Sequence, residues 1–112
     1  ATRVDKNNRF WAINYFFPGE REILKPGNDI LSSKYGKGLS HSKSERVERL
    51  VEYKIHNKKV LLTNNPPIEI KLEGDKTSRK WEAIAKYEDK GFLLATDKYP
   101  KPYTLFAYLP RL

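Results

Sequence analysis

The stretch SKSERVERLVEYKIH, residues 42–56, carries the strongest local structural signal in the chain. Its first four residues, Ser42-Lys43-Ser44-Glu45, fit a capping box, in which a serine hydroxyl and a glutamate carboxylate satisfy free backbone amides at a helix start. Apolar residues then recur at the spacing of one helical stripe: Val47, Leu50, Val51 and Ile55. The stretch therefore predicts an amphipathic helix.

Towards the C-terminus the hydrophobic period changes from that of a helix to that of a strand. A second short helix or turn is predicted over residues 58–63 and is ended by Asn64-Asn65-Pro66-Pro67. The segments that follow alternate apolar with polar residues, and Asp89-Lys90-Gly91 is typical of a hairpin turn. They predict a four-stranded antiparallel meander over residues 68–72, 81–87, 92–96 and 103–109.

Towards the N-terminus, residues 10–17 predict a strand whose two faces are both covered, and Pro18-Gly19 ends it. Residues 20–40 are rich in turn residues, and Asp29 is placed to cap one short helical turn that ends near Gly36. The predicted fold class is α+β. It has an N-terminal strand and loop, with one or two helices packed on a four-stranded antiparallel sheet.

Length and composition indicate a single basic domain over residues 1–112, with 38% hydrophobic residues. Lysine and arginine number 22 against 14 acidic residues, so the net charge is +8. A polyanionic partner is expected: nucleic acid first, an acidic protein or an anionic membrane surface second. The chain has no cysteine, which excludes disulfides and zinc-thiolate sites. No apolar run approaches the roughly 20 residues that span a bilayer, so no membrane insertion is expected.

An anion site is predicted around His41, directly before the predicted helix. The positive end of a helix dipole favours a neutral ring that can accept a proton, and the free amides of a helix start bind phosphate. Nearby cations would reach the same anion: Lys34, Lys37 and Lys43. The alternative is an exposed loop histidine beside scattered lysines.

On the predicted helix, Arg46, Arg49 and Tyr53 form a second stripe, and His56 projects near Arg49. Guanidinium groups bind phosphate through two hydrogen bonds and stabilise the charge that builds up on it. The alternative is a solvated helix face, on which both arginines pair with neighbouring glutamates.

Two hydroxyl-bearing residues, Thr104 and Tyr108, share one face of the last predicted strand. A hydroxyl there would donate to phosphate, and an aromatic ring would stack on a base. Ordinary packing on the sheet is the alternative for each of them.

A rival pattern is that of the metal-dependent nucleases. Asp29 and Glu69-Ile70-Lys71 fit their Asp…Glu-x-Lys arrangement, in which carboxylates hold Mg²⁺ and the lysine activates water. The alternation of Ile68, Ile70 and Leu72 explains the same residues as an ordinary strand. The sequence has neither a Gly-rich phosphate loop nor a histidine-rich metal spacing, so no metal site and no cofactor is predicted.

From about Leu39 to Leu112 the layout resembles the barnase/EndoU/colicin/RelE-like group of small ribonuclease toxins. The resemblance rests on Ser40-His41 at a helix start, on the arginine-bearing residues 45–50, on residues 55–66 as a second helix ending at Asn-Pro, and on a terminal strand over residues 104–108. It makes residues 39–112 the ribonuclease-like core of the domain.

The resemblance implies metal-independent cleavage of RNA by the ribose 2′-hydroxyl, without a cofactor. In that chemistry His41 is acid or base, Arg46 and Arg49 hold the phosphate, Thr104 or Tyr108 donates a hydroxyl, and His56 is the reserve proton-transfer group. It also implies a toxin that acts in the cytoplasm after delivery from a larger secreted toxin. An acidic immunity protein or antitoxin would neutralise it by covering the cleft.

The function predicted from the sequence is therefore that of an endoribonuclease toxin domain that cleaves tRNA or another structured RNA. Two alternatives stay open. One is a non-catalytic nucleic-acid-binding module that uses Lys34, Lys37, Lys43 and Tyr53. The other is a phage- or immunity-type protein-interaction domain.

Overall fold

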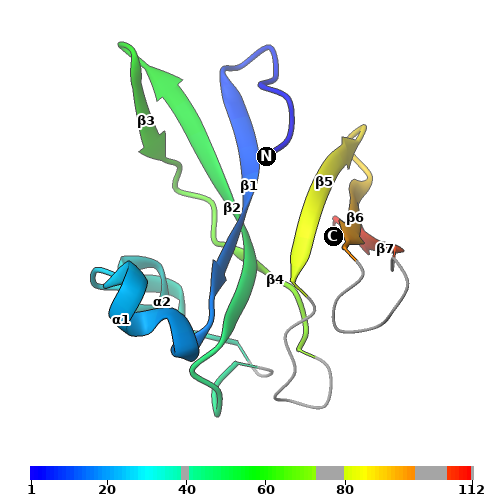
Figure 1. Cartoon of the computed structure of the whole chain (residues 1–112). Coiled ribbons are helices and arrows are strands. Elements are labelled where there is room, and N and C mark those ends of the chain that lie inside the picture. Colours follow the sequence, from blue (N-terminus) through cyan, green and yellow to red (C-terminus); the bar gives the residue numbers. More distant parts are fainter. Residues whose placement is uncertain (39–40, 73–79, 98–105, 112) are drawn as a thin grey trace.

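Two antiparallel sheets and a short helical segment build the α+β fold in the computed structural model (Figure 1). The structure describes residues 1–38, 41–72, 80–97 and 106–111. The α+β class predicted from the sequence is confirmed. The first sheet holds four strands: β1 (Arg9–Phe16), β2 (Val47–His56), β3 (Lys59–Leu62) and β4 (Ile68–Glu69).

Strand β2 is the centre of the first sheet. It pairs with β1 from Arg9↔Lys54 to Phe16↔Val47, and its other edge pairs with β3 at one end and β4 at the other. The β2–β3 hairpin turns through Asn57 and Lys58, both with positive φ, at 49° and 62°. Positive φ at both central residues is typical of a type I′ turn, whose twist matches the twist of the strands.

The helix predicted over residues 42–56 is wrong, because residues 47–56 form β2. Residues 41–44 form a turn closed by the Ser44 N–H and the His41 carbonyl (3.1 Å), and the Ser44 hydroxyl accepts the Arg46 N–H (3.1 Å). Leu50 and Val51 lie on opposite faces of β2, and both are buried. A strand covered on both faces therefore produced the apolar spacing that suggests a helical stripe.

The helical segment connects β1 to this turn. It contains the 3-10 helix η1 (Pro18–Glu20), α1 (Arg21–Leu24) and α2 (Ile30–Tyr35). The Asp29 carboxylate accepts the Ser32 N–H at the start of α2 (3.0 Å), and Gly36 ends the helix with a φ of 78°. The short helical turn predicted from Asp29 to Gly36 is confirmed. The second short helix or turn predicted over residues 58–63 is wrong, because Lys59–Leu62 form β3.

The second sheet is a meander of β5 (Trp81–Tyr87), β6 (Gly91–Thr96) and β7 (Phe106–Pro110) in that order. The hairpin predicted around Asp89-Lys90-Gly91 is confirmed. The meander has three strands and not four, because β4 pairs with β2 in the first sheet. The predicted strand positions 103–105 lie outside the described residues.

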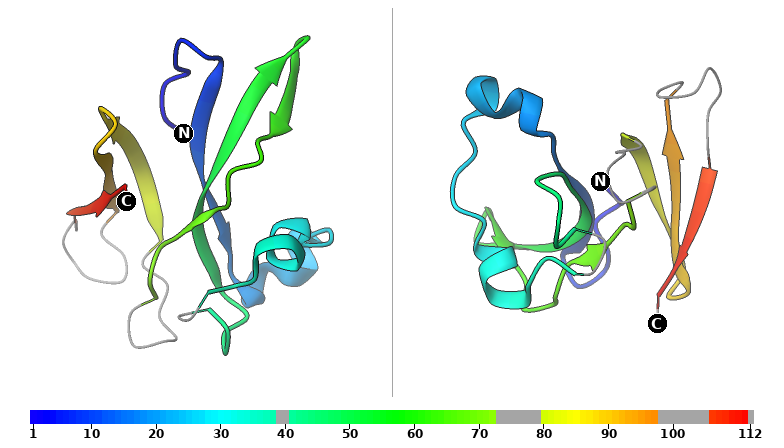
Figure 2. Two further views of the ribbon diagram at one scale, coloured as in Figure 1. Left: turned by 180° about the vertical axis from the view of Figure 1, so that it is seen from behind. Right: turned by 90° about the horizontal axis from the view of Figure 1, so that it is seen from below.

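One hydrophobic core joins the two sheets. Trp11, Leu50 and Ile70 come from the first-sheet half of the chain, and Trp81, Phe92 and Leu94 come from the second sheet. The rings of Trp11 and Phe92 meet edge to face, with centroids 5.2 Å apart. The first sheet thus lies between the helical segment and the second sheet (Figure 2). In the part of the chain that the structure describes, no helix is long and apolar enough to cross a membrane.

Candidate nucleic-acid interface

His41 is buried between β2 and β4, with 2% of its surface exposed. Its Nε2 accepts the Glu48 backbone N–H (3.1 Å), and its Nδ1 lies 3.5 Å from Glu69 Oε2. A ring nitrogen that accepts a hydrogen bond carries no proton, so the neutral ring holds its proton on Nδ1. Burial lowers the pKa of His41, and the charges of Arg49 and Lys37 lower it further. Burial, and not a helix dipole, therefore favours the neutral imidazole.

Glu69 and Gly38 close this site from the other side. Burial raises the pKa of Glu69, and the charge of Arg49 partly offsets that rise. Gly38 has a φ of 71° and lies against the Glu69 carboxylate, so a Cβ at this position would overlap the carboxylate. In this arrangement the residues that the structure describes leave only 2% of the His41 surface exposed, so the imidazole is closed to a substrate phosphate.

Arg49 is the most heavily bonded of the predicted site residues. Its Nε donates to Asn14 Oδ1 (2.7 Å), its Nη1 to Ser32 Oγ (3.1 Å) and its Nη2 to Asp29 Oδ1 (2.9 Å). Burial alone would raise the pKa of Asp29, but the hydrogen bonds from Arg49 and Ser32 outweigh burial and lower it to about 2. Arg49 therefore clamps the start of α2 to the first sheet, and each of its three nitrogens donates to a group of the protein.

Arg46 and Tyr53 also make contacts within the protein. The Arg46 guanidinium lies over the Phe17 ring, with Cζ 5.4 Å from the centroid. Tyr53 stacks on Phe10 across β1 and β2, with centroids 5.5 Å apart. Neither side chain is fully buried, so both keep part of their surface in contact with solvent.

The three lysines predicted to bind nucleic acid, Lys34, Lys37 and Lys43, are all exposed. Lys34 is in α2 with its Nζ 5.1 Å from the Tyr35 ring centroid, and Lys43 is in the turn before β2. Lys37 lines a small pocket together with His41 and Arg49. The structure thus brings Lys37, His41 and Arg49 together, as the sequence predicts, but around a closed site.

Two of the remaining candidates lie elsewhere. His56 ends β2, seven residues from Arg49, which is about 23 Å along a strand; its predicted place beside Arg49 is wrong because no helix forms. Tyr108 is in β7, and its hydroxyl donates to the Lys90 carbonyl (3.0 Å). Strand β7 and the helical segment lie on opposite sides of the molecule (Figures 1 and 2). Thr104 lies outside the described residues.

The two carboxylates of the metal-nuclease pattern are engaged with other side chains of the protein, and its lysine is exposed. Asp29 pairs with Arg49, Glu69 faces His41, and Lys71 is exposed. In residues 1–38, 41–72, 80–97 and 106–111, no three His, Cys, Asp or Glu side chains are grouped so that they could hold a metal ion.

A cluster of cations that the sequence did not reveal lies at the end of the first sheet where β1 begins and the β2–β3 hairpin turns. We call it the basic end, and it consists of Arg3, Lys6, Arg9, Lys54, Lys58 and Lys59, all exposed. Arg9 is directly opposite Lys54, and His56 is directly opposite Lys59. Because paired and alternate residues share a face of a ladder, these four side chains lie on one face.

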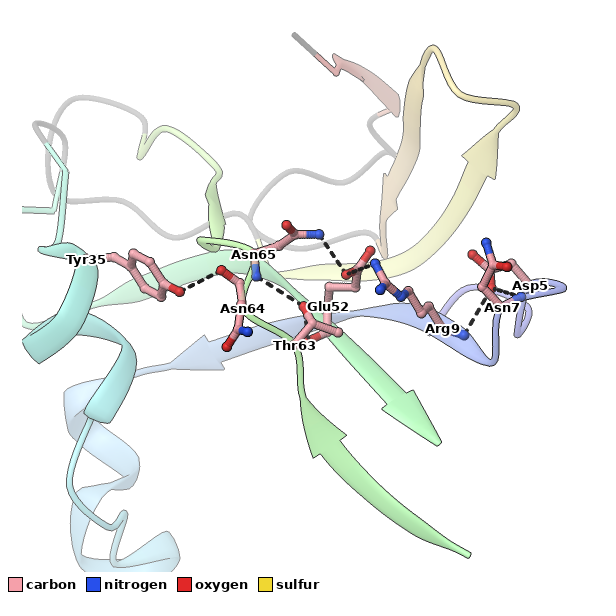
Figure 3. A network of polar contacts seen from close by, with 8 residues as sticks. All are labelled: Asp5, Asn7, Arg9, Tyr35, Glu52, Thr63, Asn64 and Asn65. Atoms are coloured by element: carbon pink, nitrogen blue, oxygen red, sulfur yellow. Dashed lines mark hydrogen bonds and ion pairs between the residues drawn. The ribbon is translucent and has the colours of Figure 1, made fainter. Parts of the chain in front are cut away.

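The carboxylates near the basic end are used to build it (Figure 3). The buried Glu52 accepts the Asn65 amide (2.8 Å) and lies 3.6 Å from the Arg9 guanidinium. Asp5 closes the turn before β1 by accepting the backbone N–H groups of Asn7 (2.8 Å) and Arg9 (3.0 Å). These contacts hold the N-terminal turn and the hairpin in place.

The opposite face of the hairpin is apolar and aromatic. It carries Phe10, Tyr53, Ile55, Val60 and Leu62, and it continues into a groove of about 590 Å³ between the first sheet and the helical segment. Arg21 and Arg49 are among the groove's lining residues. The hairpin therefore has one cationic face and one apolar face.

The basic end was missed because the helix prediction separated its members. Two signals in the sequence could have found it. Asn57 tolerates the positive φ of a type I′ turn, and Tyr53 and Ile55 alternate with Lys54 and His56 in the manner of a strand.

Comparisons with protein-family models, with curated proteins and with solved structures found no match to this chain.

Proposed function

We propose that the chain is a nucleic-acid-binding domain that holds RNA at the basic end of its first sheet. The observation that carries the proposal is the grouping of six exposed Lys and Arg side chains beside two carboxylates that are less exposed, the half-buried Asp5 and the buried Glu52. Such a group binds phosphates and releases their counterions, which is the main source of affinity for nucleic acids.

The sheet register gives the proposal further support. Like charges directly opposite each other in a ladder destabilise it, and Arg9 faces Lys54 across β1 and β2. A bound phosphate relieves this repulsion. The stacked rings of Phe10 and Tyr53 lie one residue away on the other face, where an unpaired base would find an aromatic partner. RNA with single-stranded loops is therefore the proposed ligand class.

Binding without cleavage is the simpler form of the proposal. His41, the first candidate for proton transfer, is buried and accepts a backbone hydrogen bond, and Arg49 is bonded to three protein groups. An acidic protein partner would compete with RNA for the same cations.

The test compares two double variants that remove the same charge: Lys54→Ala/Lys59→Ala at the basic end, and Lys34→Ala/Lys43→Ala near His41. RNA binding is measured by fluorescence anisotropy over a range of salt concentrations. For single strands each lost phosphate contact reduces the slope of log K against log salt by about 0.7, so the first variant should lose about 1.4. The second should keep the wild-type slope. The reverse result would move the interface to the surface around Lys34 and Lys43.

An endoribonuclease is a second candidate, and the exposure of His56 favours it. This imidazole lies on the cationic face, opposite Lys59 and beside Lys54, where it could exchange a proton with an RNA 2′-hydroxyl. The test is cleavage of structured RNA in EDTA. We expect His56→Ala to abolish any cleavage and His41→Ala to retain it; intact RNA with the wild type would exclude this candidate, and activity that EDTA abolishes would indicate a metal-dependent nuclease.

A further inference from the structure

The outer face of the second sheet is apolar and exposed. It is formed by side chains that alternate with the core-facing ones on three strands: Ala83, Ala85, Tyr87, Leu93, Ala95, Phe106, Tyr108 and Pro110. Phe106 is 81% exposed, and Tyr108, Leu93 and Tyr87 are about half exposed. Two rows of paired residues cross all three strands: Ala85↔Leu93↔Tyr108 and Ala83↔Ala95↔Phe106. These eight residues therefore form a continuous uncharged surface, and the exposed Glu82, at the bulge between Trp81 and Ala83, lies at its end.

The Tyr108 ring on this face is held close to the sheet. A Cβ on Gly91 would lie 2.9 Å from the Tyr108 ring and 2.4 Å from the Leu109 carbonyl, so the absence of a side chain lets β7 and its ring approach β6. The hydrogen bond from the Tyr108 hydroxyl to the Lys90 carbonyl fixes the ring in that position. An aromatic surface of this kind suits packing against another sheet, at about 10 Å between the two.

Charge decides what kind of partner fits this face. Residues 80–97 and 106–111 carry four basic and four acidic side chains, a net charge of 4 − 4 = 0. Residues 1–38 and 41–72 carry 14 basic and 8 acidic side chains, a net charge of 14 − 8 = +6. The neutral face offers a polyanion no attraction. It is also where two copies of this cationic chain approach each other with the least repulsion.

The rim of the face is self-complementary. The turn between β5 and β6 carries the ion pair Lys90–Glu88 (3.4 Å) and also Asp89, which pairs with Lys86 of β5 (3.5 Å), so both signs of charge border the apolar surface. In a two-fold dimer the same surface meets itself, and such a rim can exchange partners between copies. Aromatic residues at the centre with charges at the rim are the usual composition of a protein interface.

We propose that this outer face binds a second copy of the chain in a symmetric dimer. Its four large exposed side chains amount to about 400–500 Å² per copy, which is below the roughly 800 Å² of a stable interface, so the dimer is reversible. If the proposed RNA binding holds, each dimer carries two basic ends and gains avidity for long RNA. Dimerisation itself does not depend on that function.

The test is the mass of the chain in solution, measured by sedimentation equilibrium from low to high micromolar concentration. Phe106→Glu places a charge on the most exposed large side chain of the face, and Ile23→Glu is the matched control, because Ile23 is 80% exposed in α1. Circular dichroism checks that both variants fold. We expect the wild type and Ile23→Glu to approach the mass of two chains and Phe106→Glu to remain a monomer. A monomeric wild type over the whole range, or equal association of all three chains, overturns the proposal.

RNA binding separates this proposal from the previous one. We expect Phe106→Glu to bind a short RNA, long enough for one copy, as tightly as the wild type does. Loss of that binding together with a monomeric wild type would make the face an RNA-binding platform and exclude the dimer.

Discussion

Arg49 of β2 donates to Asn14 in β1 and to Ser32 and Asp29 at the start of α2, and these three segments meet only when the chain folds. The sequence predicted that Arg49 binds a phosphate, because of its residue type and its spacing from Arg46. A buried guanidinium, however, needs hydrogen-bond acceptors inside the protein, and tertiary structure supplies them. Glu48 and Glu52 in β2 are also buried, with 1% and 6% of their surfaces exposed. A sequence read for polar and apolar faces places such glutamates on the surface. The sequence could therefore group His41 with Arg49, but it could not show that the site around them is buried.

Removing the Asp29 side chain should destabilise the chain. Asp29→Ala loses both the cap of α2 and the anionic partner of Arg49, and we expect the free energy of unfolding to fall by about 2–3 kcal/mol. Urea unfolding at neutral pH measures it. Asn28→Ala, an exposed neighbour, is the control and should change stability by less than about 0.5 kcal/mol.

Acid should weaken the same clamp. The pKa of Asp29 is lowered from 3.8 to about 2 in the folded chain, so its stabilisation is complete above 3.8 and is lost as the pH falls from 3.8 towards 2. Asp29→Asn keeps a capping side chain but cannot titrate. The variant should therefore lose less stability than the wild type over this interval; equal losses would contradict the role of the Arg49–Asp29 pair.

His41 should titrate below its ordinary pKa of 6.5, because burial and the charges of Arg49 and Lys37 disfavour the imidazolium. The unfolded chain then takes up this proton first as the pH falls, so stability declines below about pH 6.5. His56→Gln leaves His41 as the single histidine, and its ring resonances can be followed by NMR. A midpoint at or above 6.5 would show that the Glu69 carboxylate dominates the site instead.

Strand β2 decides the arrangement of the elements, and the sequence predicted it as a helix. Apolar residues at positions 50 and 51 fit a helical stripe and also fit a strand buried on both faces, and local spacing cannot separate the two. The long pairing with β1 favours the strand, and it involves residues that are far apart in the sequence. The hairpin β5–β6 and the short α2 were predictable, because their turn and cap signals are local.

The β2–β3 turn offers a direct check on this strand. Lys58 has a φ of 62°, a conformation that costs a residue with a side chain about 1–2 kcal/mol, whereas glycine adopts it freely. We expect Lys58→Gly to raise the free energy of unfolding by about 1 kcal/mol. Lys59→Gly, inside β3, should lower it. Destabilisation by both substitutions would argue against the type I′ turn.

At the scale of the whole molecule, the chain divides its charge between its two sheets. The even distribution of the +8 net charge between the two halves of the sequence hides this division, because the second half supplies β3 and β4 to the first sheet as well as all of the second sheet. The α+β class was predicted from the sequence pattern, and a polyanionic partner is the expectation that the composition raises. The place where that partner would bind depends on the pairing of Arg9 with Lys54 and of His56 with Lys59, which folding creates.

NMR mapping with a short RNA tests directly whether RNA binds the basic end. Backbone amide shifts of the ¹⁵N-labelled chain are followed as RNA is added. We expect the largest changes in amide shift at Arg9 and at residues 54–59. Changes confined to residues 34–43, with Arg9 and residues 54–59 unaffected, would contradict this expectation.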